Sequence, residues 1–567
     1  MSLHSQIPCA RSGRAIARTR VAVAAFCTLL TGTAYSLEID SGNPDVAIRW
    51  DNTVRANAAV RVEGRDNKIG NSALADEGTY SFDNGDFVSK RFDLLSELDV
   101  IYKKRHGARI SGTAWYDGAY GEASRSNPAL AGVSSYVGNQ YSGYTKRFYA
   151  GPSAELMDAF VFGGIDLGDV PVNAKLGRHT TYWGESLFLG GHLHSVSYAQ
   201  SPLDLQKGFA TPGTEAKELF RPLNQLSLQA QVTDTLSLAA HAMLEWESAR
   251  YPEGGTYLGP VDFVFNGPDR QLLAVVPGVG PVFAQRGPAL EPGNTGEYGL
   301  SARWSPAWLD GTLGAYYRNF ADKLPQTLRT APTTYNLVYA DNVELYGLSL
   351  AKNIAGVSVG AEVSQRRNTP LNAAVLGLAP GLPAQGETNG PRGDTWHALV
   401  NVLGTVSKTA LFDAATWAAE LQYSRWDQVR SGANLFNAIG FAPCNATATA
   451  AAKDKWDGCT TKDYWGVGMA FTPTWYQVFP GVDLSAPMTY AVGISGNAAT
   501  VFGGNEGLGN YTLGVSADVQ QKYRFDLKYI DYVGSYKDNG TAVTSTNGLT
   551  TFLKDRGFVS LTFRTTF

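Results

Sequence analysis

The last eleven residues of the chain alternate between apolar and polar side chains. The apolar positions include Val559, Leu561, Phe563 and Phe567, and the polar positions between them include Ser560, Thr562 and Arg564. A period of two predicts a β-strand with one apolar face and one polar face. A terminal strand that ends in Phe is typical of bacterial outer-membrane β-barrels, where it serves as an assembly signal. An edge strand of a soluble sheet can show the same pattern, so the rest of the sequence is needed to distinguish a membrane barrel from a soluble sheet.

The first long alternating segment covers residues 46–62, which is too long for a typical strand of a soluble sheet. A barrel strand that rises beyond the bilayer can reach this length. Similar segments recur at 88–104, 108–120, 157–167, 173–182, 226–232, 236–247, 297–305, 311–320, 343–352, 357–366, 397–406, 416–426, 464–471, 486–495, 511–520, 523–532 and 558–567. The sequence therefore predicts an all-β fold, a transmembrane antiparallel up-and-down β-barrel of about 18 strands (16–18).

The connections between these segments alternate in length. Short ones, such as 104–107 and 233–235, alternate with connections of roughly 15 to 45 residues. Outer-membrane barrels have short turns in the periplasm and long loops outside the cell. We therefore expect the long connections outside the cell and both chain ends in the periplasm.

The composition agrees with a membrane barrel. The chain holds 62 Gly, 28 Tyr, 25 Phe and 12 Trp, yet its mean hydropathy is only −0.17. Lipid-facing and lumen-facing residues alternate in such a barrel, so the average hydropathy cancels, and aromatic residues collect at both membrane interfaces.

The N-terminal 36 residues resemble an export signal. Four basic residues, Arg11, Arg14, Arg18 and Arg20, precede the apolar run 21–30. Ala34 and Ser36 then offer small residues to a signal peptidase, so we expect cleavage before Leu37. The alternative is a membrane anchor, but a spanning helix needs about 20 apolar residues. Residues 37–567 would then form a single barrel domain in the outer membrane of a Gram-negative bacterium.

Charge and cysteine content both change when the leader is removed. The leader holds four of the 47 basic residues and no acidic one, so the mature chain has 43 basic and 51 acidic residues. A mildly acidic chain without a basic run gives no support for nucleic-acid binding. Cys9 and Cys27 leave with the leader, and Cys444 and Cys459 remain. Two cysteines in an exported protein predict a disulfide rather than a metal pair, since no His or third Cys lies near them.

Charged residues form three rows on the predicted lumen face. They are Arg49, Asp51, Arg55 and Arg61 in the first strand, Arg91, Asp93, Glu97 and Asp99 in the second, and Arg109 and Asp117 in the third. Because these strands are neighbours, the rows would form ladders of opposite charge. They could line the pore as an eyelet that orients a polar solute. Alternatively, they form a network of ion pairs that stiffens the wall, since mixed signs cancel rather than select.

Several motifs follow one another in an order that resembles one family. They lie at 84–99, 114–117, 176–179, 182–188, 201–205, 212–219 and 221–222. Over nearly the whole mature chain, these motifs resemble the family called domain of unknown function 1302. The resemblance implies a proteobacterial outer-membrane barrel that accompanies export or uptake systems, or catabolic pathways, for hydrophobic compounds such as steroids and aromatics. It implies no catalytic residue.

The long connection 183–224 is dense in charged and aromatic residues. Within it, residues 214–220 could form a short helix that Pro222 stops. We expect this connection to fold into the lumen as a constriction; the alternative is an outer loop packed on its neighbours. The candidate constriction residues are Arg178, Trp183, Glu185, Asp204, Lys207, Glu215, Lys217 and Arg221.

Two other outer connections, 272–283 and 373–383, contain apolar runs that water-exposed loops rarely carry. They could capture a hydrophobic solute, or pack together as a lid. His192 and His194 could share an ion, but two ligands are too few for a closed metal site. The sequence therefore predicts no metal, no cofactor and no catalytic residue.

These patterns favour a channel over two other functions. A barrel of this size is wide enough for an aqueous lumen, and the roughly nine residues before the first strand are too few for an N-terminal plug. We expect passive or facilitated passage of small, hydrophobic or aromatic and steroid-like compounds. The alternatives are a loop-filled docking barrel that works with a periplasmic transport partner, and an outer-membrane hydrolase. The other expected partners are outer-membrane lipids, the barrel assembly machinery and the small-molecule solute.

Overall fold

The computed structural model describes residues 37–567 except 122–123, 131, 189–193, 212–215, 375 and 377–389. The predicted export signal, residues 1–36, lies outside this range. Strands are the dominant elements. Among the described residues, no helix is long and apolar enough to cross a membrane.

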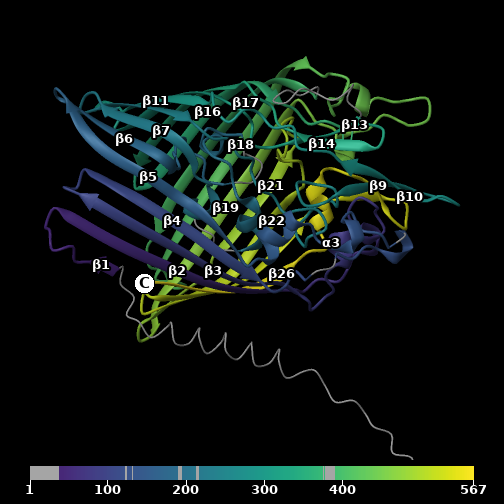
Figure 1. Cartoon of the computed structure of the whole chain (residues 1–567), viewed down its shortest axis with the longest axis horizontal. Helices are drawn as coiled ribbons and strands as arrows, with labels where there is room; N and C mark the ends of the chain where they lie inside the picture. The colour runs from purple at the N-terminus through teal and green to yellow at the C-terminus, as the bar shows by residue number, and fades with distance from the viewer. Residues whose placement is uncertain are drawn as a thin grey trace, which may run out of the picture.

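One antiparallel sheet curls until its two ends meet, which forms a closed barrel (Figure 1). Its strands are β2 (Val46–Arg61), β3 (Phe87–Tyr102), β4 (His106–Asp117), β5 (Ser153–Leu167), β6 (Val170–His179), β7 (Leu223–Gln231), β8 (Leu236–Met243), β11 (Tyr298–Trp304), β12 (Gly311–Phe320), β15 (Val343–Ile354), β16 (Val357–Pro370), β17 (Arg392–Val406), β18 (Ala414–Ser431), β19 (Asp463–Phe479), β20 (Val482–Ser485), β21 (Met488–Ser495), β22 (Gly509–Val519), β23 (Tyr523–Val533) and β26 (Phe558–Thr566). The last strand, β26, pairs with both β23 and β2 and so closes the barrel.

The described part of the barrel wall has eighteen strands, because β20 and β21 are two halves of one strand. Both halves pair with β19 on one side and with β22 on the other. The predicted eighteen-strand antiparallel barrel is confirmed, and each predicted segment overlaps one observed strand. The additional short strand β1 (Leu37–Ile39) extends the wall beside β2.

The two ends of the barrel differ, as the alternating connection lengths predict. Tight turns, such as 168–169 and 355–356, join neighbouring strands at one end, where the C-terminus also lies (Figure 1). The long connections gather at the opposite end. They contain α2 (Asn67–Gly70), α3 (Asp76–Tyr80), η1 (Pro128–Leu130), η2 (Val137–Asn139), α4 (Gly143–Thr145), η3 (Lys146–Ala150), η4 (Ser197–Ala199), α5 (Leu205–Ala210), α6 (Ala216–Leu219), β9 (Arg270–Val276), β10 (Gly280–Arg286), β13 (Gln326–Ala331), β14 (Thr334–Val338), η5 (Ala442–Cys444), η6 (Lys455–Asp457), β24 (Tyr536–Asp538), β25 (Val543–Thr546) and η7 (Leu549–Leu553).

The long connections share a hydrophobic core of their own. Ile69, Leu205, Phe263, Tyr335 and Phe552 belong to five different connections, and all five pack into one buried cluster. Burial of so much apolar surface between loops stabilises their mutual arrangement. The loop end of the barrel is therefore a packed layer rather than a set of independent loops.

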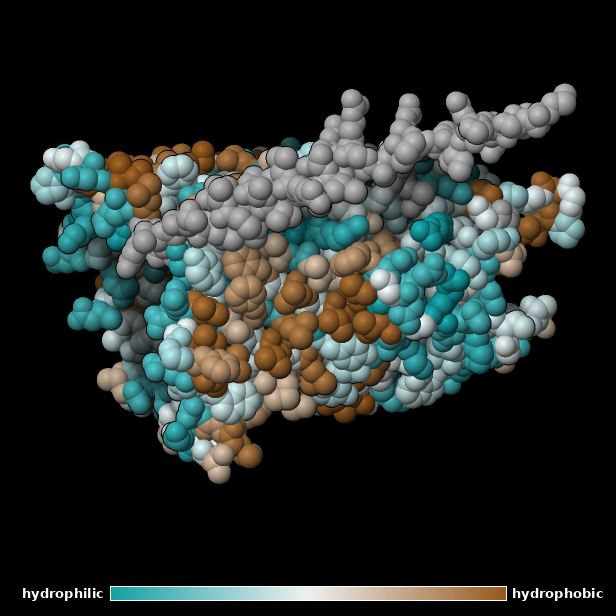
Figure 2. All heavy atoms as spheres, turned by 90° about the horizontal axis from the view of Figure 1, so that it is seen from below, coloured by the Kyte–Doolittle hydropathy of each residue, from teal (hydrophilic) through white to brown (hydrophobic). Residues whose placement is uncertain are grey.

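The barrel wall is apolar outside and polar inside. On β2, Trp50 faces outward and is 42 % exposed, whereas Arg55 faces inward and is 3 % exposed. Leu348 on β15 and Leu421 on β18 also face outward and are 59 % and 44 % exposed. Figure 2 shows an apolar band across one face of the barrel, with hydrophilic residues at both ends. An exposed apolar surface of this extent marks a contact with a membrane or with another protein.

The apolar segment 272–283 lies in a β-hairpin. β9 and β10 pair with each other and join β13 and β14 in a second, four-stranded sheet. The base of the hairpin packs in the loop core through Ala284, which is fully buried, whereas Val279 at its tip is 76 % exposed. Most of the second apolar segment, 373–383, lies outside the described residues.

Candidate functional site

The connection between β6 and β7, residues 180–222, contacts two separate parts of the wall. Its first part contacts β16 and β18, and its second part contacts β2, β3 and β5. Several strands separate these two groups in either direction around the ring. The connection therefore crosses the lumen.

Two buried glutamates hold the backbone of the first part. Glu362 of β16 accepts the N–H groups of Glu185 and Val196 at 3.0 and 2.7 Å. Glu420 of β18 accepts the N–H of Leu187 at 2.7 Å. A buried N–H group that lost such an acceptor would pay its full desolvation cost. Because the donors are main-chain groups, these contacts fix where the backbone of the connection runs and do not depend on its side chains.

Trp183 and Gly184 turn the chain from β6 toward these glutamates. The Trp183 ring stacks on His241 of β8, with the ring centroids 4.6 Å apart. Gly184 has a φ of +90°, and a Cβ at this position would lie 2.6 Å from Ser197 Oγ and 2.8 Å from Glu362 Oε2. Glycine is the residue that adopts this conformation without strain and leaves the space that the turn needs.

Ion pairs hold the second part of the connection on the other wall. Glu218 of α6 accepts two hydrogen bonds from Arg55 of β2 at 3.1 and 3.0 Å, and its carboxylate lies 2.7 Å from Lys207 Nζ. Lys217 contacts Glu97 of β3 at 2.5 Å. Burial acts to raise the pKa of Glu218, but Lys207 and Arg55 outweigh it and lower the pKa below its usual range. Glu218 is therefore ionised at neutral pH.

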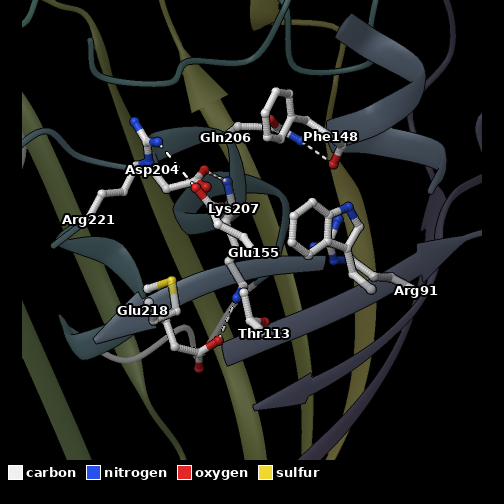
Figure 3. Close-up of a pocket in the computed structure, with 11 residues that line it drawn as sticks. Arg91, Thr113, Phe148, Glu155, Asp204, Gln206, Lys207, Glu218 and Arg221 are labelled. Carbon is white, nitrogen blue, oxygen red and sulfur yellow. Dashed lines mark hydrogen bonds and ion pairs between the residues drawn. The ribbon is translucent and has the colours of Figure 1, made fainter. Parts of the chain in front are cut away.

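A further group of ion pairs surrounds a small pocket against α5 (Figure 3). Glu155 of β5 accepts hydrogen bonds from Arg250 at 2.6 and 2.7 Å and from Arg221 at 3.2 Å, and Arg250 also reaches Asp204 at 3.1 Å. Asp204 caps α5 by accepting the N–H of Lys207 at 2.9 Å. The pocket measures about 360 Å³, including the solvent at its mouth. Arg221, Lys207 and Arg250 each lie against a carboxylate, so the charges around this pocket balance.

The three charged rows lie side by side on the inner face of β2, β3 and β4. Arg55 is opposite Asp93, and Arg91 is opposite Asp117. Arg91 donates to Asp93 at 2.9 Å. In the third row, Arg109 forms ion pairs with Glu97, Asp99 and Asp158. The structure thus brings six of the ten predicted pore-lining residues into two ion-pair groups, one of Arg55, Arg91 and Asp93 and the other of Glu97, Asp99 and Arg109.

The environment of the rows changes along the barrel axis. Arg49 is exposed and Asp51 is half-buried, and they lie opposite Asp99 and Glu97 toward the tight-turn end. Arg61 lies at the loop end with no exposed surface; it pairs with Asp555 at 3.0 Å and donates to the carbonyl groups of Thr79 and Phe82. Arg61 therefore contacts the packed loops, whereas Arg49 faces solvent.

The remaining described constriction residues contact either the barrel wall or the residues that directly follow β8. Arg178 of β6 pairs with Glu245 at 2.8 Å and with Glu247 at 3.0 Å. Arg221 contacts Glu247 as well. Glu215 lies outside the described residues, and α6 covers the described end of the predicted helix 214–220.

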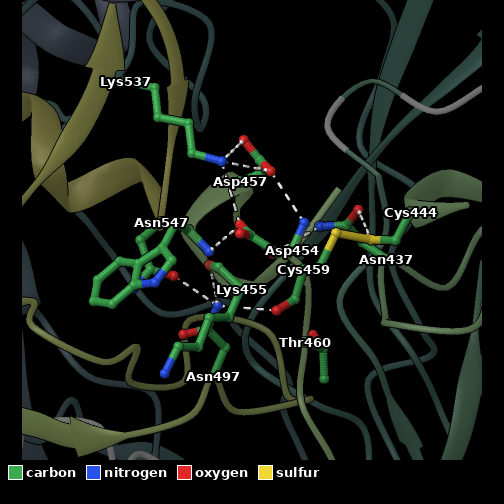
Figure 4. Close-up of a disulfide and its surroundings, with 12 residues drawn as sticks. Asn437, Cys444, Asp454, Lys455, Asp457, Cys459, Thr460, Asn497, Lys537 and Asn547 are labelled. Atoms are coloured by element: carbon green, nitrogen blue, oxygen red, sulfur yellow. Dashed lines mark hydrogen bonds and ion pairs between the residues drawn. A yellow bond between two sulfur atoms is a disulfide. The ribbon is translucent and has the colours of Figure 1, made fainter. Parts of the chain in front are cut away.

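Cys444 and Cys459 form a disulfide in the connection between β18 and β19 (Figure 4). Asn497, from the connection between β21 and β22, donates to the carbonyl of Cys459 at 2.9 Å. Lys537, from the connection between β23 and β26, pairs with Asp457 at 2.9 Å. The disulfide therefore lies where three long connections meet.

Matches to known proteins extend along the whole barrel. A family model described as Protein of unknown function (DUF1302) matches residues 17–567. The chain belongs to the DUF1302 family. The resemblance that the sequence motifs predict is therefore confirmed. No curated protein matches the chain.

Solved structures similar to this DUF1302 barrel share little sequence with it. Pseudomonas aeruginosa OpdK, solved with vanillate, has a TM-score of 0.39 at 9 % identity, over 92 % of this chain and 98 % of OpdK. Acinetobacter baumannii OccAB4 has a TM-score of 0.37 at 10 % identity, over 92 % and 98 % of the two chains. P. aeruginosa OccD3 (OpdP) has a TM-score of 0.37 at 11 % identity, over 95 % and 94 %. At these values, neither their solutes nor their loop arrangements transfer to the DUF1302 chain.

Sequence reasoning missed the wall residues that hold the crossing connection. Glu362 and Glu420 lie within predicted strands, but neither belongs to a row of charged residues of the kind that identified the first three strands. Glu362 shares its face of β16 with the buried residues Ser364 and Arg366, so the period of two would have placed it in the lumen. Arg250 lies in a long connection without periodicity, and no sequence signal marks it.

Proposed function

We propose that this DUF1302 protein is an outer-membrane channel through which small hydrophobic, aromatic or steroid-like compounds pass by passive or facilitated diffusion. The observation that carries the proposal is a closed barrel with an apolar outer face and a polar lumen that one connection crosses. In a bilayer every backbone polar group of the wall must be paired, and a closed barrel meets this requirement. The apolar outer face suits contact with lipid.

Exposed aromatic residues near both ends of the wall support the membrane location. Tyr102, Trp304 and Trp308 lie at the tight-turn end and are 43 %, 43 % and 72 % exposed. Tyr116, Tyr298 and Trp465 lie near the loop end of their strands and are also exposed. Aromatic rings prefer the headgroup level of both leaflets. With the tight turns in the periplasm, the packed loop layer would face the exterior.

The crossing connection is the proposed constriction. Trp183, Glu185, Lys207, Lys217 and Arg221 contribute to it, and the charged rows of β2 to β4 line the lumen beside it. Its contacts with opposite walls support this role, because a segment held at both sides narrows the free cross-section of a pore.

A loop replacement tests the constriction. Asp204 N–H donates to Leu219 O at 2.8 Å and Arg221 N–H to Pro202 O at 2.9 Å, so the two ends of the α5–α6 segment are adjacent. Replacing 205–218 with two glycines should therefore leave the barrel closed and raise its single-channel conductance in planar bilayers. Shortening the exposed β9–β10 tip at 277–279 is the matched control and should leave conductance unchanged. Equal conductance of the folded replacement and the native chain would contradict the constriction.

The shared core of the long connections favours a second candidate function, a docking barrel that works with a periplasmic transport partner. A packed loop layer is what such a barrel would need to keep its lumen closed. Absence of conductance from both the native chain and the 205–218 replacement would favour this function over the channel.

A further inference from the structure

Three buried carboxyl groups meet inside the loop layer and form an acidic cluster. Asp76 and Glu77 belong to α3, in the connection between β2 and β3, and Asp262 belongs to the connection between β8 and β11. Each of the three is at most 3 % exposed. Their chain neighbours Ala75 and Phe263 are part of the hydrophobic core that the long connections share. An isolated charge is costly in such a setting, because it cannot be hydrated.

The acidic cluster joins two of the long connections. The backbone N–H of Asp262 donates to the carbonyl of Leu74 at 2.7 Å, and the N–H of Glu77 donates to Asp262 Oδ2 at 3.4 Å. A hydrogen bond also joins the carboxyl groups of Asp76 and Asp262. Two carboxyl groups can form such a bond only when one of them carries a proton. The contact between α3 and the segment around Asp262 therefore includes a bound proton.

The hydrogen bonds around the cluster assign this proton to Asp262. Asp76 accepts hydrogen bonds from the hydroxyl of Ser126 at 2.8 Å and from the N–H of Asn127 at 2.6 Å. Glu77 accepts three serine hydroxyls at 2.9 to 3.0 Å, those of Ser124, Ser134 and Ser135. In contrast, Asp262 Oδ1 receives no hydrogen bond from the described residues. Donors favour the ionised form of a carboxyl group, so Asp262 is the member of the cluster that is neutral.

The nearby positive charge is engaged elsewhere. Arg556 is the cation that acts on Asp262. Its three nitrogens donate to Asp555, to the carbonyl of Tyr257 and to Thr79. Other charged or titratable groups of the packed elements are Arg125, Tyr136, Tyr141, Glu253 and Arg270. Burial raises the pKa of both tyrosines, so they are neutral. Ionisation of all three carboxyl groups would therefore place like charges against one another in the core.

Burial and mutual repulsion both favour the protonated state of the cluster. Burial, with the charges of Glu77 and Asp76, raises the pKa of Asp262 well above its usual range. A group with a raised pKa contributes fully to the free energy of unfolding below its ordinary pKa. That contribution is lost as the pH rises through the raised pKa. The contact between the two connections should therefore weaken at alkaline pH.

We propose that Asp262 is a proton-operated latch that holds the loop layer closed. While it is protonated, its O–H donates to Asp76 and keeps the β8–β11 connection on α3. As the pH rises, the proton leaves to solvent, and the negative charges of Asp76, Glu77 and Asp262 repel one another. The segment around Val261 and Phe263 then separates from α3, which opens the loop end of the lumen. The inference rests on the proposed channel function and adds regulation of that channel by pH.

Hydrogen exchange of the refolded full chain in lipid vesicles tests the latch, because the N–H of Asp262 itself makes the contact with Leu74. After correction for intrinsic rates, exchange in residues 260–264 should be at least about tenfold faster at pH 8.5 than at pH 5, since one unit of pKa shift corresponds to a factor of ten. Asp262→Asn should remove this difference, because the amide can donate to Asp76 at either pH.

Glu253→Gln is the matched control for this experiment. Glu253 is a carboxyl group of the same connection and is 1 % exposed, but it accepts the N–H of Gly267 and not a group of α3. This variant should keep the difference in exchange. Two results would overturn the latch: equal corrected exchange of the native chain at both pH values, or an undiminished difference in Asp262→Asn.

A second variant keeps the test valid if Asp262→Asn does not fold. Glu77→Gln removes one of the charges that face Asp262 and should reduce the difference in exchange; an undiminished difference would overturn the latch. Bilayer recordings separate the latch from the channel. Conductance that rises from pH 5 to pH 8.5 in the native chain but not in Asp262→Asn supports both. Faster exchange without conductance at either pH supports the latch and refutes the channel. Conductance that does not change with pH supports the channel and overturns the latch.

Discussion

The two walls that hold the crossing connection do so by different chemistry. At β2 and β3 the contacts join side chains of opposite charge, as between Arg55 and Glu218. At β16 and β18 the carboxylates of Glu362 and Glu420 accept main-chain N–H groups. The first kind of contact depends on the residues of the connection, whereas the second depends only on its path. Substitutions in the connection should therefore release one side, and substitutions in the wall the other.

The largest expected effect is loss of Glu218. Glu218→Ala leaves Arg55 and Lys207 buried without their shared carboxylate, which costs about 3–5 kcal/mol when one partner of a buried pair is removed. Denaturant unfolding of the barrel in lipid vesicles measures this loss. The double variant Arg55→Met/Glu218→Leu should recover part of it, since apolar side chains replace two of the three charges and Lys207 keeps Asp93 at 4.0 Å. An equal loss in the double variant would show that packing, and not charge, holds this side.

On the other wall, Glu362→Gln should cost about 1–3 kcal/mol, because the amide offers one acceptor oxygen for two buried N–H groups. The matched variant is Glu185→Gln in the connection, whose backbone N–H makes the contact. It should change the free energy of unfolding by no more than about 0.5 kcal/mol. If Glu185→Gln proved as costly as Glu362→Gln, the contact would depend on side chains and the contrast between the walls would fail.

Gly184→Ala probes the path of the connection directly. The left-handed backbone alone costs an alanine about 1–2 kcal/mol, and its Cβ would meet Ser197 and Glu362. Gly293→Ala is a suitable control, since a Cβ there has no neighbour within 4 Å. Both variants can be compared by denaturant unfolding and by conductance. A change in conductance in Gly184→Ala but not in Gly293→Ala would show that the turn at Gly184 affects the pore.

A change of pH should act on the ion-paired side and on the loop layer in opposite directions. Glu218 has a lowered pKa. Its contribution to the free energy of unfolding is therefore present above the ordinary pKa of Glu and is lost as the pH falls through the lowered pKa. Burial, together with Asp76, raises the pKa of Glu77 in α3 to about 7. The contribution of Glu77 to the free energy of unfolding is therefore full below the ordinary pKa of Glu and is lost as the pH rises toward 7.

Hydrogen-exchange protection factors at pH 4 and pH 8 can separate the two segments. Protection should be higher at pH 8 in α6 and higher at pH 4 in α3. Glu77→Gln should reduce the pH dependence of α3, where burial also raises the pKa values of Asp76 and Asp262, and leave that of α6 unchanged. The same direction of change in both segments would mean that the whole barrel, and not these contacts, responds to pH.

Part of the candidate site was visible in the sequence. The charge density of 183–224 pointed to a crossing connection, and Asp204, Lys207, Lys217 and Arg221 do contact the wall or its partners. The glutamates of the other wall were not predicted, because their partners are backbone N–H groups, which every residue except proline carries. Nor could the sequence indicate that Arg250 approaches Glu155 from a connection 95 residues away.

By itself, the sequence determined the number of strands, their alternating faces and the contrast between tight turns and long connections. These features are local. Each strand residue faces either the lumen or the outside, and this alternation appears in the sequence as a period of two. Only the tertiary structure decided which strands face each other across the lumen and how the loops share a core. Such contacts join residues far apart in the chain, and ring closure, rather than any local pattern, brings them together.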